Sequence, residues 1–207
     1  MRASLSIAAA LIGAAAAAPK IPFVSTTDTI PGAPVVSTRQ SAPQACFLIG
    51  DETLPAETAD IAADLASTVT CDKAVTTIAK VPDTISGSTT FSSIDFSQSS
   101  QTPLQFALSK FATAEPLSDN NLAAFQDMLN VYQATEAGIR SVGGSLAIKV
   151  PKFLLEMQVS RIQTAQGNPP AAAGQQVDHL RDKVLKNAPK EAQNLLDQVT
   201  KLATQLS

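Results

Sequence analysis

The side chains that could carry chemistry in this chain are few, and their spacing matches no common catalytic pattern. His179 is the single histidine among 207 residues and lies beside Asp178 on a polar helical stretch. A serine nucleophile needs such an imidazole, oriented by a carboxylate and facing the hydroxyl. The Gly-x-Ser-x-Gly turn that presents a catalytic serine is absent, and Gly143-Gly144-Ser145 does not match it. We expect His179 to be an exposed helical residue.

A pair of carboxylates, as in glycoside hydrolases, is the second chemistry to consider. Most of the glutamates that could form such a pair fall on expected solvent faces of helices; those considered are Glu57, Glu115, Glu136, Glu156 and Glu191. A hydrolase that binds sugar usually presents aromatic platforms, and this chain has one Tyr and no Trp. Solvated helix faces are therefore the favoured interpretation, and a hydrolase whose carboxylates cannot be placed is the alternative.

Composition excludes further classes of site. One His and two Cys cannot supply an ordinary zinc site, which needs four such ligands, or three and a water. The net charge of −3 has the wrong sign for a surface that binds nucleic acid. An apolar content of 44% is too high for a fully disordered chain. We expect no metal, no cofactor and no nucleic-acid partner.

The N-terminus has the pattern of a secretory signal peptide. Arg2 precedes a short apolar run and a series of alanines, and small residues at Ala15 and Ala17 predict cleavage after Ala17. Residues 1–17 are then the signal peptide, and the mature charge is 14 − 18 = −4. No later segment has the ~20 apolar residues that a membrane-spanning helix needs. We expect an exported, extracellular protein, with association with the cell wall left open.

Cys46 and Cys71 are the only cysteines, and in an exported chain they most simply form one disulfide. The loop they close would contribute roughly 3.5 kcal/mol on the chain-entropy model. A redox role is less favoured because the two do not form a C-x-x-C pair. Between them, an apolar stripe predicts a helix that opens near Pro55, so the disulfide would tie the start of this helix to its end; the stripe is Ile61, Leu65 and Val69.

The rest of the chain predicts a mainly α fold. Residues 18–45 are rich in Pro, Ser and Thr, so we expect them to be extended or disordered. Residues 46–167 form the disulfide-linked helical domain, 168–174 a linker, and 175–207 C-terminal helices packed on the same bundle. Within the domain we expect a short helical stretch with Val75, Ile78 and Val81, and a Ser-rich loop with one short strand from Ser86 to Ser100. A helix follows that Thr102 caps and Pro103 opens.

Two longer helices form the centre of the expected bundle. Ser118 and Asp119 are the expected cap of the first helix, whose apolar stripe is interrupted at Thr135 and Glu136; the stripe is Leu122, Phe125, Leu129, Tyr132 and Ile139. Gly143-Gly144 ends this helix, and the short connection predicts an antiparallel hairpin. Pro151 either kinks the second helix or marks its start.

The second helix suggests two interpretations. Lys149, Lys152 and Arg161 flank a very apolar stretch, which could form an amphipathic surface that meets a lipid headgroup. The favoured interpretation is the central helix of a bundle with long cationic side chains at its rim. The two interpretations are compatible if the bundle encloses an apolar ligand cavity. The side chains that would line such a cavity are Phe125, Leu129, Leu154 and Met157.

The whole pattern resembles small secreted proteins of filamentous fungi. The resemblance rests on the Ala-rich signal, the Ala18-Pro19 start, the Ser/Thr/Pro segment and the single cysteine pair. Residues 136–144 and 149–153 read like a family core. Over residues 55–165 the chain is similar in style to the fungal hydrophobic-surface-binding and cell-wall mannoprotein group, which implies a helical bundle that binds surfaces or lipids.

We therefore predict a non-enzymatic exported helical protein. Its expected partner is an apolar surface, a lipid, or a component of the cell wall or of a host. The alternatives are the hydrolase described above and an effector that binds a host protein.

Overall fold

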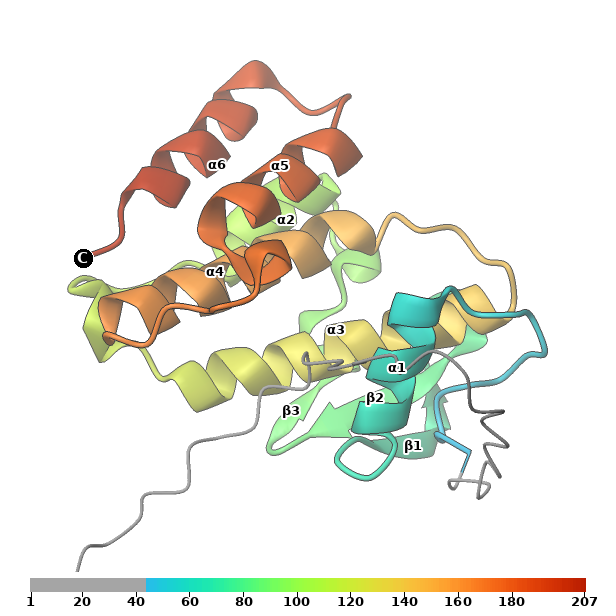
Figure 1. Ribbon diagram of the computed structural model, residues 1–207. Helices are drawn as coiled ribbons and strands as arrows, with labels where there is room; N and C mark the ends of the chain where they lie inside the picture. Colours follow the sequence, from blue (N-terminus) through green and yellow to red (C-terminus); the bar gives the residue numbers. More distant parts are fainter. Residues whose placement is uncertain (1–43) are drawn as a thin grey trace, which may run out of the picture.

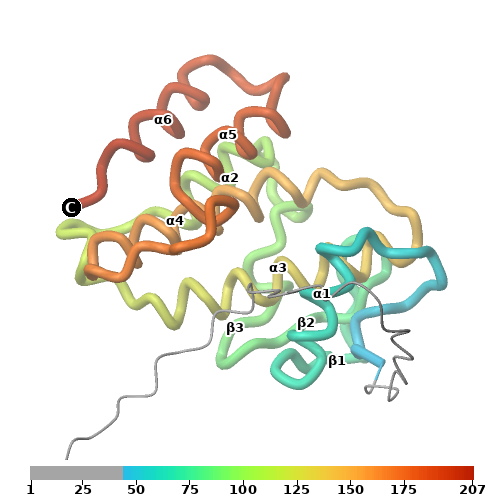
Figure 2. Tube along the Cα trace, viewed as in Figure 1, coloured from blue at the N-terminus to red at the C-terminus, as the bar shows by residue number. Residues whose placement is uncertain are grey.

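The computed structural model describes residues 44–207, so the predicted signal peptide and most of the segment 18–45 lie outside the described residues. Helix α3 (Leu122–Ser141) lies at the centre of this part of the chain, as Figures 1 and 2 show. A small sheet and α1 (Ala56–Leu65) pack on one side of α3. Helix α4 (Lys149–Ala165) packs on the other side, and the C-terminal helices cover α4.

The predicted mainly helical fold with one disulfide is confirmed, with a small sheet in addition. The remaining elements are β1 (Thr70–Thr76), β2 (Pro82–Ser86), β3 (Thr89–Thr90), α2 (Pro103–Lys110), α5 (Val177–Asn187) and α6 (Gln193–Thr204). The strands form an antiparallel sheet in the order β1-β2-β3. Short 3₁₀ turns occupy most of the Ser-rich region between β3 and α2.

The short helix predicted around Val75, Ile78 and Val81 is wrong except for a distorted 3₁₀ turn at Ile78–Lys80. Val75 lies in β1, and Val81 directly precedes β2. The three-residue spacing of these apolar side chains arises because a tight turn separates two strands, with Ala79 and Lys80 both at positive φ. The β-branched residues around this turn favour extended backbone, and that preference outweighs the helical spacing.

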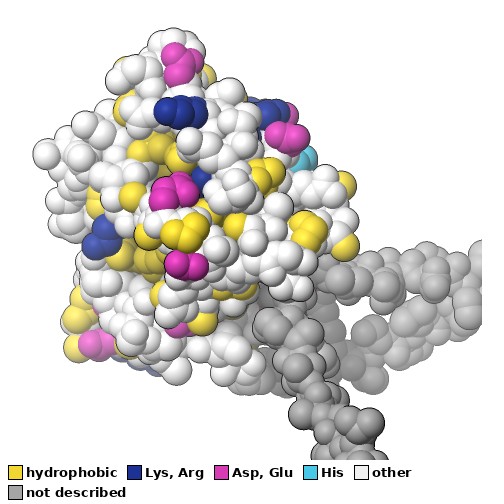
Figure 3. Space-filling model, turned by 90° about the vertical axis from the view of Figure 1, so that its left-hand side faces the viewer, with side chains coloured by type: hydrophobic (Ala, Val, Ile, Leu, Met, Phe, Trp, Pro, Cys, Tyr) yellow, Lys and Arg dark blue, Asp and Glu magenta, His cyan; other side chains and the backbone are white. Residues whose placement is uncertain are grey.

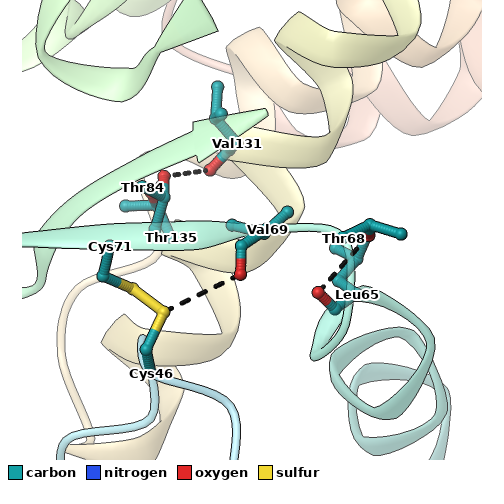
Figure 4. The surroundings of a disulfide bond; sticks show 8 residues. All are labelled: Cys46, Leu65, Thr68, Val69, Cys71, Thr84, Val131 and Thr135. Atoms are coloured by element: carbon teal, nitrogen blue, oxygen red, sulfur yellow. Dashed lines mark hydrogen bonds between the residues drawn. A yellow bond between two sulfur atoms is a disulfide. The ribbon is translucent and has the colours of Figure 1, made fainter. Parts of the chain in front are cut away.

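The predicted disulfide is present, but it does not tie the two ends of α1. Cys46 lies in the segment before α1, and Cys71 is the second residue of β1. Their Cα atoms are 6.0 Å apart, and Figure 4 shows the bond crossing from the N-terminal segment to the edge of the sheet. The expectation placed Cys71 at a helix end because Val69 continues the stripe of α1, whereas α1 ends at Leu65. The disulfide therefore anchors the first described residues to the sheet.

The residues that cap α2 and α3 show how far local sequence signals predict the start of a helix. Thr102 accepts a hydrogen bond from the Gln105 amide, so the predicted cap of α2 is confirmed. The predicted cap of α3 is wrong, because Asn121 accepts the bond from the Ala124 amide. Ser118 and Asp119 lie instead in a 3₁₀ turn (Leu117–Asp119) whose apolar residue Leu117 is fully buried.

The connection between α3 and α4 is longer than two glycines, since α3 ends at Ser141 and α4 begins at Lys149. Pro151 is in the first turn of α4, so it marks the start of that helix rather than a kink. Thr135, which interrupts the apolar stripe of α3, is polar because it contacts the sheet. Thr84 of β2 donates to the Val131 carbonyl, and its hydroxyl lies 2.9 Å from that of Thr135.

Aromatic side chains fill the space between α3 and the elements around it. The Tyr132 ring packs edge-on against Phe91 and Phe111, with centroids 5.1 and 5.5 Å away. Its hydroxyl donates to the Ile94 carbonyl at 2.7 Å, so the polar end of this buried ring has a partner.

The C-terminal helices extend the core. The predicted stripe of α5 is buried, namely Val177, Leu180 and Val184. On α6, Val199 and Ala203 point inward. Within residues 44–207, none of the helices has the length and apolar character to cross a membrane.

Candidate functional site

A recess of about 390 Å³ opens where the end of α4 meets the start of α5 and the end of α6. Its wall combines hydroxyl-bearing, apolar and amide side chains: Ser160, Thr164, Pro169, Pro170, Gln176, Val177, Asp178, Ala203, Thr204 and Leu206. Figure 3 views the molecule from the side on which the C-terminus lies in Figure 1, and hydrophobic side chains gather across the middle of that face between separated charged ones. The recess is therefore amphipathic.

Ser160 is the unusual residue of this wall. Its side chain is 2% exposed, and its Oγ has no hydrogen-bond partner among the described atoms. The neighbouring Thr164 shows the usual arrangement, since its hydroxyl donates back to the Ser160 carbonyl at 2.8 Å. A buried hydroxyl without a partner costs about 1–3 kcal/mol.

The start of α5 forms another side of the recess. Gln176 is the N-cap residue of α5, and its side chain makes no capping hydrogen bond. Asp178 follows in the first turn, where its negative charge suits the positive end of the helix dipole. Its carboxylate is paired with Arg181 at 2.8 Å. Polar groups thus converge on the recess from α5 as well as from α4.

Arg161, the residue after Ser160, is fully buried and holds the end of α6 in place. Its Nε and Nη2 donate to the Gln205 carbonyl at 3.1 and 2.8 Å, and its Nη1 donates to the Gln158 side chain and to Thr113. Burial lowers the pKa of Arg161, and the charge of Glu115 acts in the opposite direction. The end of α6, which lines the recess, is therefore held by a guanidinium whose hydrogen-bond acceptors are neutral oxygens.

A second polar cluster lies between α3 and the first half of α4. Glu136 is 5% exposed, and both of its carboxylate oxygens are in ion pairs. Arg140 lies 2.8 Å from one oxygen, and the Lys152 ammonium lies 3.0 Å from the other. Burial alone would raise the pKa of Glu136, but the two cations together hold it below the ordinary value.

Glu156 lies one turn after Lys152 on α4, and its pKa is displaced in the opposite direction to that of Glu136. The Gln133 amide donates to its carboxylate at 3.2 Å. Burial raises the pKa of Glu156, Glu136 adds to this effect, and Lys152 opposes it. Two neighbouring carboxyls thus have pKa values displaced in opposite directions, an arrangement found in acid/base pairs and also in structural ion clusters.

The four predicted lining residues occupy the core. Leu154 and Met157 are fully buried, Phe125 is 8% exposed, and Leu129 is half-buried against them. The recess between α4, α5 and α6 is lined by other residues. That these four side chains line a ligand cavity stays a prediction.

Two expectations about charged side chains are wrong. The expectation of solvent faces fails for two of the five glutamates, because Glu136 is buried and Glu156 half-buried at the contact between α3 and α4. Lys152 and Arg161 are buried rather than at the rim of the bundle. His179, in contrast, is exposed as expected.

The sequence contained a signal for the polar cluster that the apolar stripes obscured. Gln133, Glu136 and Arg140 recur at helical spacing on α3, and Lys149, Lys152 and Glu156 do so on α4. In an antiparallel hairpin these two series face each other in reverse order, so Gln133 meets Glu156 and Glu136 meets Lys152. No comparable signal marks Ser160, because only the placement of α5 and α6 shows that its hydroxyl lacks a partner.

The comparisons with known proteins give a family. Residues 48–207 match the model of a domain of unknown function (DUF7143), and the chain belongs to this family. A search of the curated proteins and a search of the solved structures each found no match. Within residues 44–207, no group of three or more His, Cys, Asp or Glu side chains is arranged to hold a metal ion.

Proposed function

We propose that this protein is an exported, non-enzymatic binding protein that holds an amphipathic molecule in the recess between α4, α5 and α6. The observation that carries the proposal is the buried, unpartnered hydroxyl of Ser160 on the wall of that recess. A ligand whose head carries a hydroxyl, carbonyl or carboxyl group would complete the hydrogen bonding of Ser160 and remove its cost.

The size and the lining of the recess support a small ligand. About 390 Å³ falls within the range of roughly 300–1,000 Å³ typical of small-molecule sites. Pro170, Val177 and Ala203 are buried and supply apolar walls, while Leu206 is 37% exposed at the end of the chain. A short alkyl or aromatic body suits these walls, and the polar head would point toward Ser160.

Export is the second part of the proposal. The N-terminal sequence pattern supports it, and the Cys46–Cys71 disulfide is compatible with an oxidising compartment. A lipid or another amphiphile of a cell wall or a host surface is the partner that agrees best with the recess.

Binding of a fluorescent alkyl carboxylate, and its displacement by unlabelled amphiphiles, would test the recess. Thr204→Trp places a large side chain at a lining position, and we expect it to abolish binding. The matched control is Thr200→Trp, an exposed position one turn earlier on α6 that is not part of the lining. We expect Ser160→Ala to weaken binding by about fivefold, the equivalent of one neutral hydrogen bond. Equal affinity of the protein and its Thr204→Trp variant would refute the proposal.

A hydrolase is a second candidate, because Glu136 and Glu156 are neighbours whose pKa values are displaced in opposite directions. Against it, both oxygens of Glu136 are occupied by Arg140 and Lys152. Turnover on a panel of glycosides and esters that is lost in Glu156→Gln, while an exposed-site control such as Glu57→Gln stays active, would establish it.

A further inference from the structure

Four cations from three helices gather beside the start of α4. Arg140 comes from the last turn of α3, Lys149 and Lys152 from the first turn of α4, and Lys183 from α5. The ammonium groups of Lys152 and Lys183 lie 4.0 and 6.0 Å from the centre of the same Phe153 ring. Partial burial lowers the pKa of Lys149, and the charges of Arg140, Lys152 and Lys183 lower it further. Lys149 therefore lies close enough to the other three cations to be repelled by them, although Glu136 acts in the opposite direction.

The negative charge at this place does not balance them. Glu136 is ionised because Arg140 and Lys152 hold its pKa down, while burial favours the protonated form of Glu156. Within this group of six side chains, four cations face two carboxylates, which is a surplus of at least two positive charges, 4 − 2. The surplus is local, because the whole chain carries a net charge of −3.

The place of two of these cations at the start of α4 adds to the surplus of positive charge. Lys149 and Lys152 lie in the first turn of α4, which contains no acidic residue. The start of a helix carries a partial positive charge, so cations there are unfavourable by about 0.3–1 kcal/mol each. A placement that costs stability in an otherwise well-satisfied fold points to a function that uses it.

Part of the cluster can reach a ligand. The side chain of Arg140 is 18% exposed, and Lys149 and Lys183 are half-buried. Arg140 uses Nε and Nη2 on Glu136, so its Nη1 is available to another acceptor. Neither Lys149 nor Lys183 forms an ion pair within residues 44–207. Lys152, in contrast, is 9% exposed and committed to Glu136.

We infer that Arg140, Lys149 and Lys183 form an anion site that binds a phosphate group. A phosphate carries close to two negative charges at neutral pH, which matches the surplus, and its oxygens accept several charge-assisted hydrogen bonds at once. The site lies by the first half of α4 and uses none of the residues that line the recess at the end of that helix.

Titration of the disulfide-intact protein with inorganic phosphate, followed by NMR of the Lys149 and Arg140 signals, tests the site. We expect saturable shifts, and we expect the double variant Lys149→Gln/Lys183→Gln to weaken binding at least about tenfold. The matched control is Lys186→Gln/Lys190→Gln, which removes the same charge at exposed positions. We expect that control to bind as the unmodified protein does, and circular dichroism should show both variants folded.

A second experiment distinguishes the two sources of a phosphate group. Sedimentation with phosphatidylglycerol vesicles, compared with phosphatidylcholine vesicles, reports a lipid headgroup that carries its negative charge on the phosphate. Binding to either free phosphate or the anionic vesicles supports the site if it depends on Lys149 and Lys183. Absence of binding to both probes, or equal weakening in the control variant, overturns the inference.

Discussion

Each end of α4 carries a buried cation, and the two cations have different kinds of hydrogen-bond partner. At the first end, Lys152 is buried against a carboxylate, with its ammonium 3.0 Å from Glu136. At the other end, Arg161 is buried without a carboxylate in contact and donates to neutral oxygens of Gln205, Gln158 and Thr113. Both side chains come from one helix, and both were expected at its rim.

The difference follows from the chemistry of the two head groups. A compact ammonium group is strongly hydrated and needs a full negative charge to leave water, whereas a planar guanidinium is less hydrated and directs its donors at several neutral acceptors. The Lys152 end therefore depends on the ionisation of Glu136. The Arg161 end depends on the position of α6, because the Gln205 carbonyl belongs to the C-cap residue of that helix. One end of α4 is sensitive to pH, and the other end is sensitive to the docking of the C-terminus.

The largest expected effect is that of Arg161→Met. The change leaves the Gln205 carbonyl and the Gln158 side chain without their donor, so we expect a loss of about 3 kcal/mol in the free energy of unfolding. Urea denaturation at pH 7 and at a pH below 4.5, the ordinary pKa of a glutamate carboxyl, should give the same loss at both, since no carboxylate pairs with this guanidinium. A loss that disappears at the lower pH would contradict the contrast between the two ends.

Lys152→Met is the matched change at the other end of the helix. It leaves Glu136 with Arg140 alone, so we expect a loss of about 2 kcal/mol at pH 7. Because the folded state lowers the pKa of Glu136, the ion pairs stabilise the protein fully above the ordinary value of 4.5 and lose this effect as the pH falls through the lowered pKa. The difference between variant and parent should therefore shrink below pH 4.5. A difference that is constant across this range would show that Lys152 acts by packing alone.

Glu156→Gln sharpens the same contrast from the carboxylate side. Folding raises the pKa of Glu156, so its ionisation opposes folding increasingly as the pH rises above 4.5. The glutamine can still accept the bond from Gln133 but cannot ionise. We expect the variant to be more stable than the parent at pH 7 and nearly equal at pH 4, by an amount smaller than the loss in Lys152→Met. A decrease in stability at pH 7 would mean that the carboxylate is needed in its charged form.

Ser160→Ala has the smallest expected effect on stability, and the opposite sign from the two methionine changes. Removal of a buried hydroxyl without a partner, replaced by a better helix former, should raise the free energy of unfolding by about 1 kcal/mol. The control is Ser109→Ala on α2, an exposed serine whose hydroxyl donates to the Phe106 carbonyl, where we expect a change within about 0.5 kcal/mol. A loss of stability in Ser160→Ala would show that its hydroxyl has a partner in solution.

The helices were predictable from the sequence where local chemistry decides. Thr102 and Pro103 started α2 as expected because a cap and a first-turn proline act within one turn. The β1–β2 turn was not predictable, since positive φ at Ala79 and Lys80 is unusual for these residue types and arises from pairing between the strands. The cap of α3 was misplaced by a few residues because Ser118 and Asn121 are both good capping residues.

The candidate site was accessible from the sequence only in part. The polar positions of α3 and α4 recur at helical spacing, so their meeting could have been inferred from the hairpin. The recess could not, because its wall comes from three helices and from the segment at Pro169 and Pro170. Which of many serines lacks a hydrogen-bond partner depends on the atoms around it and on no feature of its own sequence neighbourhood.

By itself the sequence determined the helical class and the disulfide pair, because each depends on composition or on local patterns, whereas export stays a prediction. The tertiary structure decided the sheet, the burial of Lys152 and Arg161, and the recess beside Ser160. The physical reason is that burial and hydrogen-bond satisfaction are properties of packed neighbours distant in the chain. Arg161 illustrates this, since its principal acceptor, the Gln205 carbonyl, lies 44 residues away.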